Sequence, residues 1–249
     1  MIIIKSADEI AVMREAGRIV AIVLQRMSEA VKPGIKTRQL NDLAEKELGR
    51  WNGAKASFKG YKGFPASICA SVNEEVVHGI PGSRVLNEGD IISLDFGVIY
   101  KGFQGDAALT VGVGQVSPEA ARLMEVTRAS LAQGIAAARD GANLGDIGEA
   151  TQRYVERRGY SVVREYSGHG IGREMHEDPL VPNFGSKGEG IKLKEGMTLA
   201  LEPMVNVGNW KTRQNSNGWT VHTADSSLSA HFEHTIAIRS GEAEILTVP

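Results

Sequence analysis

Two separate segments of this chain repeat at the same offset of 107 residues. The pattern KPG at 32–34 recurs as RDG at 139–141, and NEGDIISLDF at 87–96 recurs as KEGMTLALEP at 194–203. A shared offset in two segments indicates an internal duplication, with halves at about 6–111 and 117–240. We therefore predict a single domain over residues 1–249. Its fold class is α+β, with two pseudo-twofold-related αα-β halves around an antiparallel sheet and a functional site where the halves join.

Each half is predicted to begin with two helices. Ser6-x-x-Glu9 is a capping box, and Ser117-Pro118 combines an N-cap with proline at the first helical position. Apolar residues at helical spacing follow each of these starts. A loop is predicted at 52–66, and strands at 67–71, 161–166, 197–202, 219–223 and 231–238. The predicted helices begin near Ser6, Thr37, Ser117 and Asn143.

The segment from Asp90 to Val111 reads as a β-hairpin with its turn around residues 100–102. Apolar residues alternate with Asp95 and its neighbours, as in a strand with two distinct faces. An even-length loop puts Asp95 and Asp106 on one face, opposite each other or on a diagonal, with Cβ atoms roughly 5–8 Å apart. Like charges at that spacing repel unless a positive charge lies between them. The alternative is two solvated aspartates on an exposed face.

Composition excludes several classes of protein. The 249 residues carry a formal net charge of −2 without a run of Lys or Arg, so no nucleic-acid footprint is present. The amino terminus lacks a secretory signal pattern, and the longest apolar run, 19–24, is too short to cross a bilayer. Cys69 is the single cysteine, so we expect no internal disulfide and a reducing cytoplasm.

More candidate site residues lie in the second half. Glu202 occupies the place that Asp95 has in the first half, and Glu233 lies in the predicted strand 231–238. His169 stands among glycines in GHGIG, and His176 follows seven residues later. The glycine spacing does not match a dinucleotide-binding loop, and the histidine spacing does not match H-E-x-x-H.

For the remaining candidates a structural role is the better interpretation. Cys69 is interpreted as a small apolar residue, because nothing beside it in sequence would lower the pKa of its thiol. The other histidines are interpreted as surface or hydrogen-bonded residues. They are His222, His231 and His234.

Four strand carboxylates and one or two histidines converging in a nearly neutral chain require cations. Oxygen-rich ligation with a single imidazole suits Mn, Fe(II), Co or Zn in a paired site. Two such ions roughly 3.5–4 Å apart would lower the pKa of a shared water and polarise a carbonyl group.

With these residues in hand, the chain resembles the type I, bacterial-type methionine aminopeptidases from end to end. The resemblance rests on ICASVNEEVVHGIP, SLDFGVIYKGFQGDAALT, GHGIGREMHEDP, ALEPMV, GWTVHT and SAHFEHT. It implies the pita-bread fold and removal of the initiator methionine from nascent chains. It implies that Asp106 and Glu233 bridge or chelate two divalent ions. The implied metal ligands are Asp95, Asp106, His169, Glu202 and Glu233.

The resemblance also implies catalytic and substrate-binding residues. His78, His176 and Glu202 are the expected catalytic residues, and both histidines contact substrate. Phe58 and Met175 stand where a cysteine and a phenylalanine are expected in the family. The expected methionine pocket comprises Phe58, Tyr61, Phe64, Cys69, Met175 and Trp219.

The expected partners are the N-termini of nascent polypeptides, with a transient visit to the ribosome left open. Nucleic acid and membrane are not expected partners, and the chain is expected to be a monomer. Two alternatives remain at this point. One is a prolidase or aminopeptidase P-like hydrolase, and the other is a non-enzymatic pita-bread binding protein.

Overall fold

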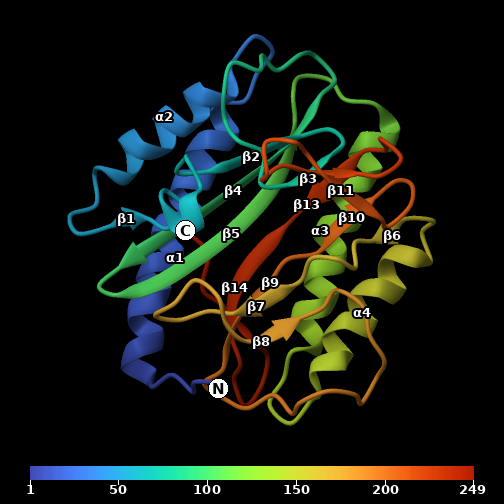
Figure 1. Ribbon diagram of the computed structural model, residues 1–249. Helices are drawn as coiled ribbons and strands as arrows, with labels where there is room; N and C mark the ends of the chain where they lie inside the picture. Colours follow the sequence, from blue (N-terminus) through green and yellow to red (C-terminus); the bar gives the residue numbers. More distant parts are fainter.

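The computed structural model describes residues 1–249 and contains four long helices that flank a central sheet (Figure 1). The first pair is α1 (Ala7–Ala30) and α2 (Thr37–Leu48), and the second pair is α3 (Pro118–Ala137) and α4 (Leu144–Glu156). The predicted capping box is present, since Ser6 Oγ accepts from the Glu9 backbone and the Glu9 side chain accepts from the Ser6 N–H. The predicted helix starts are therefore confirmed.

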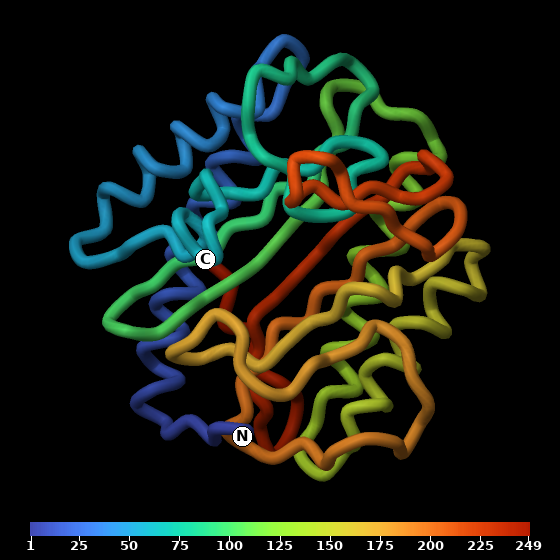
Figure 2. Tube along the Cα trace, in the orientation of Figure 1, coloured from blue at the N-terminus to red at the C-terminus, as the bar shows by residue number.

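The central sheet has nine strands, and its main path runs β1-β4-β5-β14-β9-β7-β8. Strand β2 pairs with β4, and β15 pairs with β14. Strands from distant parts of the sequence lie side by side, since β14 (red) runs between the hairpin (green) and the β9 segment (orange) in Figure 2. The strands are β1 (Lys55–Ala56), β2 (Cys69–Val72), β4 (Ile91–Tyr100), β5 (Phe103–Gly112), β7 (Gly168–Gly170), β8 (Glu177–Val181), β9 (Thr198–Leu201), β14 (Glu233–Ala237) and β15 (Glu244–Ile245).

Two small sheets and one short 3₁₀-helix complete the fold. The first small sheet contains β13 (Ser229–His231), β10 (Met204–Asn206) and β6 (Ser161–Val162). The second contains β11 (Thr212–Gln214), β12 (Val221–Thr223) and β3 (Glu75–Val77). The 3₁₀-helix, η1 (Tyr61–Gly63), lies in the segment predicted as a loop. No helix has both the length and the hydropathy needed to cross a bilayer.

The predicted hairpin is present as β4 and β5, joined by Lys101 and Gly102. Both turn residues have positive φ, 48° and 79°, as a two-residue type I′ turn requires. Asp95 pairs with Ala108, and Gly97 pairs with Asp106. The two aspartates are therefore diagonal neighbours on one face, as predicted.

The opposite face of the hairpin builds the core. Ile92, Leu94 and Phe96 are fully buried and pack with the apolar side of α1. The helix lies directly on β5, because a Cβ at Gly105 would come 2.8 Å from the Gly17 nitrogen. This packing fixes the hairpin, so its other face is free to carry polar side chains.

The two halves share more than their sequence pattern. Lys36 forms an isolated bridge with Val85, and Asn143 forms one with Lys192, so both partners are displaced by the same 107 residues. Helix α4 likewise begins 107 residues after α2. We therefore propose that the chain is one domain built from two structurally equivalent halves, as the sequence pattern predicts.

Some predicted strands differ from the structure. The strand expected at 231–238 is broken at Phe232, so β13 and β14 belong to different sheets. The predicted strand 161–166 is only two residues long, and β1 lies in the segment 52–66 that was predicted as a loop. The other strands that were not predicted are β3, β7, β8, β10, β11 and β15. These short strands are set by pairing with distant partners, which local periodicity does not report.

Candidate metal centre

Five acidic or imidazole side chains come from adjacent strands and line one cavity of about 200 Å³. Asp95 lies on β4 and Asp106 on β5. Glu233 opens β14, Glu202 directly follows β9, and His169 is the middle residue of β7. The structure thus brings together all five predicted metal ligands.

Small residues separate these side chains along the sheet and leave room between them. Ala108 pairs with Asp95 on one side and with Glu233 on the other. Ala200 pairs with His169 on one side and with Thr235 on the other. The Thr235 hydroxyl also bonds the backbone of β5, donating to the Asp106 carbonyl at 2.8 Å. The strand positions are therefore rigid, and the space above the alanines is enclosed by carboxylates.

Three of the five residues already have the spacing of a metal site. One ligand atom from each of Asp106, His169 and Glu233 lies within 4.8 Å of the other two. His169 Nδ1 contacts the Gly170 carbonyl oxygen at 2.8 Å. Because a carbonyl only accepts, Nδ1 carries the proton, which leaves Nε2 as the ligand atom. That Nε2 lies 3.5 Å from Glu202 Oε1.

No Lys or Arg forms an ion pair with the carboxylates, and desolvation lowers the pKa of the histidines beside Glu202 and Glu233 to about 4 and about 3. Burial raises the pKa of Asp95 to about 7. Burial, reinforced by the neighbouring carboxylates, raises the pKa of Asp106 and Glu233 well above the ordinary range. One oxygen on each of these three residues is buried without a hydrogen-bond partner. Buried oxygens that lack donors and repel each other fit a site for divalent cations.

The remaining walls of the cavity are aromatic and apolar. Phe64 and Trp219 meet edge to face with ring centroids 5.1 Å apart, and Tyr61 and Cys69 also line the space. Cys69 is buried, and desolvation raises the pKa of its thiol, in line with its interpretation as a small apolar residue. Such a cavity is smaller than the roughly 300–1,000 Å³ of drug-sized sites and suits one side chain.

The lining of the cavity differs from the expected methionine pocket at two residues, Met175 and Lys62. Met175 is buried but does not line the cavity, and it packs behind Phe58, which does. Both converge on Gly97, where a Cβ would come 2.9 Å from Met175 Cε and 3.0 Å from Phe58 Cε1. Lys62 lines the cavity beside Tyr61, a role that the sequence analysis missed. Its place between the two aromatic residues of YKGF is the signal that could have revealed it.

His78 and His176 both reach the cavity from outside the five strands. His176 Nδ1 lies 2.8 Å from the Tyr61 hydroxyl, and its ring centroid is 4.2 Å from that of His169. Desolvation, then the Lys62 charge, lowers the pKa of His176. His78 has φ +60°, a backbone strain that is common at functional sites. Desolvation lowers the pKa of His78 to about 4.

Of the three histidines interpreted as structural, His222 and His231 are buried and His234 is half-buried. His222 Nε2 lies 3.1 Å from Asn215 Nδ2, and His234 Nδ1 lies 2.8 Å from Thr247 Oγ1. His231 differs from the expectation, because it is buried and its Nε2 lacks a partner, 3.9 Å from Glu233 Oε2. Desolvation lowers the pKa of His231 to about 3.

The raised carboxyl pKa values predict that the metal-free protein loses stability as the pH rises above about 6.5. The buried histidines are neutral there in both states, because their folded pKa values lie below the ordinary value of 6.5. The cavity carboxyls are ionised in the unfolded chain but retain protons in the folded protein, so stability falls as pH passes through the folded pKa. For each proton that the folded state alone retains, the free energy of unfolding falls by about 1.4 kcal/mol per pH unit, which lowers Tm by roughly 3–6 °C.

Calorimetry of the metal-free protein at pH 7 and pH 8 checks this expectation. The metal-loaded protein is the control, since bound cations keep the carboxyls ionised in the folded state. A metal-free Tm that stays level or rises over this interval would contradict the raised carboxyl pKa values.

Comparison with known proteins identifies the family. The model of metallopeptidase family M24 matches residues 11–240. A methionine aminopeptidase of Clostridium acetobutylicum is 55% identical over 249 residues, covering 100% of this chain and 99% of the relative. The chain belongs to the methionine aminopeptidases of family M24. This confirms the resemblance on which the sequence analysis drew.

Two solved structures agree with this assignment. The crystal structure of the Thermotoga maritima methionine aminopeptidase matches with a TM-score of 0.98 at 45% identity, and each chain is covered fully. An Xaa-Pro dipeptidase of Bacillus anthracis matches with a TM-score of 0.78 at 23% identity, with 98% of this chain and 61% of that one covered. The second likeness concerns the fold alone. The predicted pita-bread fold is therefore confirmed, and family membership makes the protein a metallopeptidase that uses divalent metal.

Proposed function

We propose that the protein is a metal-dependent aminopeptidase that removes an N-terminal methionine when the second residue is small. The observation that carries the proposal is the single cavity in which five ligand-type side chains adjoin an aromatic wall. The residues suited to metal binding and the residues suited to side-chain recognition therefore line the same cavity. The methionine aminopeptidase at 55% identity supports the same activity.

The acidic face of the cavity is proposed to hold two divalent cations, with Mn, Fe(II), Co and Zn as the candidates. Asp95, Asp106, His169, Glu202 and Glu233, which line the cavity together, would hold these cations. The buried, unpartnered oxygens of Asp95, Asp106 and Glu233 support this assignment. When bound, the cations act as Lewis acids on the scissile carbonyl and lower the pKa of a water at the site.

Three residues are proposed to act directly on the reacting groups. His176 donates a hydrogen bond to the carbonyl oxygen as negative charge develops on it. His78, which lines the same cavity, binds the substrate backbone. Glu202 is proposed to take a proton from water and return it to the leaving amine; burial, then the Asp95 charge, raises the pKa of its carboxyl, which favours proton uptake.

The apolar wall gives a physical reason for methionine specificity. Tyr61, Phe64 and Trp219 are aromatic, and sulfur–aromatic contacts favour a flexible thioether. Met175 supports this wall from behind through Phe58, and Cys69 adds a small apolar surface. The free α-amino group has to enter the acidic end, so the enzyme acts on chain ends only.

A tripeptide panel is expected to show strong dependence on the first two residues. Met-Ala-Ser should be cleaved well, and Leu-Ala-Ser more slowly but not refused, since an apolar pocket discriminates by about 1–3 kcal/mol per methylene. Met-Leu-Ser should be rejected at the crowded rim, and N-acetylated Met-Ala-Ser should not react. The measurement is kcat/KM for each peptide under identical metal loading. Equal turnover of Met-Ala-Ser and Met-Leu-Ser, or cleavage of the acetylated peptide, would contradict the specificity model.

The two alternatives are separated by one further comparison. A prolidase-like enzyme would cleave an X-Pro dipeptide in preference to Met-Ala-Ser, and a binding protein would cleave neither, with or without divalent metal. The likeness to an Xaa-Pro dipeptidase extends to the fold and carries no substrate preference. Metal analysis of protein purified without added metal would identify the resident ion and its occupancy.

The proposed substrates also define the cellular setting. Initiator methionine is exposed on nascent polypeptides, so we propose a cytoplasmic monomer that meets the ribosome transiently. Cosedimentation with translating ribosomes and the sedimentation coefficient of the isolated protein test these two points separately.

A further inference from the structure

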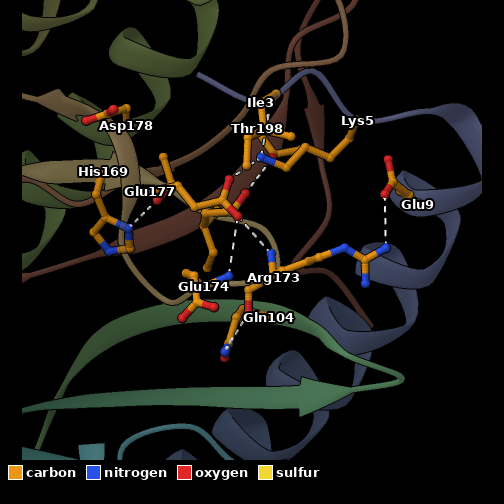
Figure 3. Close-up of polar contacts among 12 residues, drawn as sticks. Ile3, Lys5, Glu9, Gln104, His169, Arg173, Glu174, Glu177, Asp178 and Thr198 are labelled. Carbon is orange, nitrogen blue, oxygen red and sulfur yellow. Dashed lines mark hydrogen bonds and ion pairs between the residues drawn. The ribbon is translucent and has the colours of Figure 1, made fainter. Parts of the chain in front are cut away.

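A buried ion pair ties the loop that carries His176 to the amino-terminal segment. Lys5 Nζ pairs with the Glu177 carboxylate, and only 3% and 5% of the two side chains are exposed. Figure 3 shows Lys5 reaching from the amino-terminal segment to Glu177 at the start of β8. Lys5 is itself fixed, because its backbone N–H donates to the Gly196 carbonyl at 2.8 Å and its Nζ donates to the Ile3 carbonyl at 3.2 Å.

The turn before His176 is shaped around this pair. Glu177 Oε1 accepts from the backbone N–H groups of Arg173 at 2.8 Å and Glu174 at 3.3 Å, while Oε2 accepts from Lys5. A Cβ at Gly172 would come 2.4 Å from Glu177 Oε1 and 2.5 Å from Lys5 Cε. Glycine therefore lets the turn close over the ion pair.

The other ionic contacts of this loop are exposed. Arg173 pairs with Glu9 at 3.2 Å, with 61% and 31% of the side chains exposed. The Met1 amino group pairs with Asp178, whose side chain is 61% exposed. Exposed pairs of this kind contribute little, because solvent screens them and side-chain ordering opposes them. Among the ionic contacts of this loop, the Lys5–Glu177 pair is the buried one.

We propose that Lys5, acting through Glu177, is a positioning residue that holds His176 in place for the reaction. One peptide bond joins Glu177 to His176, whose ring lines the cavity and contacts Tyr61 and His169. A displaced Glu177 carboxylate therefore shifts the imidazole relative to the substrate carbonyl. This inference deepens the proposed function, on which its catalytic readout rests.

Lys5→Met is expected to lower kcat roughly 10- to 100-fold, because a misplacement of about 1 Å far from the chemistry can cost 10²-fold. KM should stay near the wild-type value, since the metal ligands and the aromatic wall are untouched. Arg173→Met is the matched control, because it removes an ionic contact from the same loop at an exposed position. It should leave kcat near the wild-type value. Equal losses in the two variants would overturn the proposal.

A double-mutant cycle with His176→Ala distinguishes positioning from general damage. If Lys5 acts through His176, Lys5→Met causes no further loss of kcat in the His176→Ala background. The same fold-loss in both backgrounds would overturn the inference. Should Lys5→Met unfold, Glu177→Gln takes its place in the same cycle, because its amide oxygen can still accept from the backbone of the turn.

Hydrogen exchange in the metal-free protein gives a readout that needs no activity. The amide protons of Arg173 and Glu174 should exchange faster in Lys5→Met than in wild type, and unchanged exchange would contradict the role of the ion pair. A wild-type protein that fails to cleave Met-Ala-Ser would instead contradict the proposed function. Its loop would still be expected to respond to Lys5→Met in the exchange experiment.

Discussion

Asp106→Asn is expected to abolish turnover while leaving the protein folded. Asp106 is buried among the carboxylates, and one of its oxygens lies within 4.8 Å of ligand atoms of His169 and Glu233. Several kcal/mol of transition-state stabilisation depend on metal binding, so a loss of more than about 10³-fold follows at one factor of ten per 1.36 kcal/mol. The measurements are kcat on Met-Ala-Ser and the metal content of the dialysed protein.

The same substitution should have opposite effects on the stability of the metal-free and metal-loaded proteins. Without metal, asparagine removes a buried carboxyl whose raised pKa costs stability at high pH, so the Tm at pH 8 should hold or rise. With metal, the gain of about 2.7 kcal/mol expected at 100 times the Kd should shrink, because affinity is lost. Asp42→Asn, at an exposed position of α2, is the matched control and should change neither Tm. Normal turnover with full metal content in Asp106→Asn would refute the role of the hairpin acids.

Local sequence was sufficient to predict the hairpin and the helices. Asp95 and Asp106 could be placed on one face because side chains alternate regularly along each strand, and a loop of even length keeps both residues on the same side. The helix starts at Ser6 and Asn143 were equally predictable, since capping residues act within one turn of the chain.

The rest of the candidate site depends on contacts between distant segments. Glu233 meets Ala108 only because β14 inserts between β5 and β9, and no short-range pattern reports that insertion. The duplication suggested a partner for Asp95 in Glu202, but the place of His169 relied on the family resemblance. The structure also separates Met175 from the cavity, a packing detail that depends on Phe58 and Gly97 together.

The Lys5–Glu177 pair was not predictable for a related reason. The two residues are 172 positions apart, and a single lysine near the start of a chain carries no local signal. Sequence indicates which residue types could perform the chemistry, whereas the structure shows which residues hold them in position. Variants of residues that hold others in position, such as Lys5, should alter kcat without altering metal content.

His176→Ala is expected to bind metal normally and to lose roughly 10²–10³ in kcat, the usual effect of removing one donor to a developing oxyanion. The geometry supports this role. The Tyr61 hydroxyl lies 2.8 Å from Nδ1, and when it donates there the proton of the neutral ring sits on Nε2, where it can be donated to a carbonyl. Burial favours that neutral ring, since desolvation lowers the pKa of His176.

Tyr61→Phe should therefore have a smaller effect in the same direction, because it removes the hydrogen bond that orients the ring but keeps the imidazole. His78→Ala should differ from both by raising KM as well as lowering kcat, since His78 is proposed to bind the substrate backbone. The measurements are kcat and KM on Met-Ala-Ser, together with metal content by elemental analysis. A His176→Ala variant that loses metal would make His176 a ligand instead. A His176→Ala variant that keeps wild-type kcat would contradict the proposal that His176 donates a hydrogen bond to the developing oxyanion.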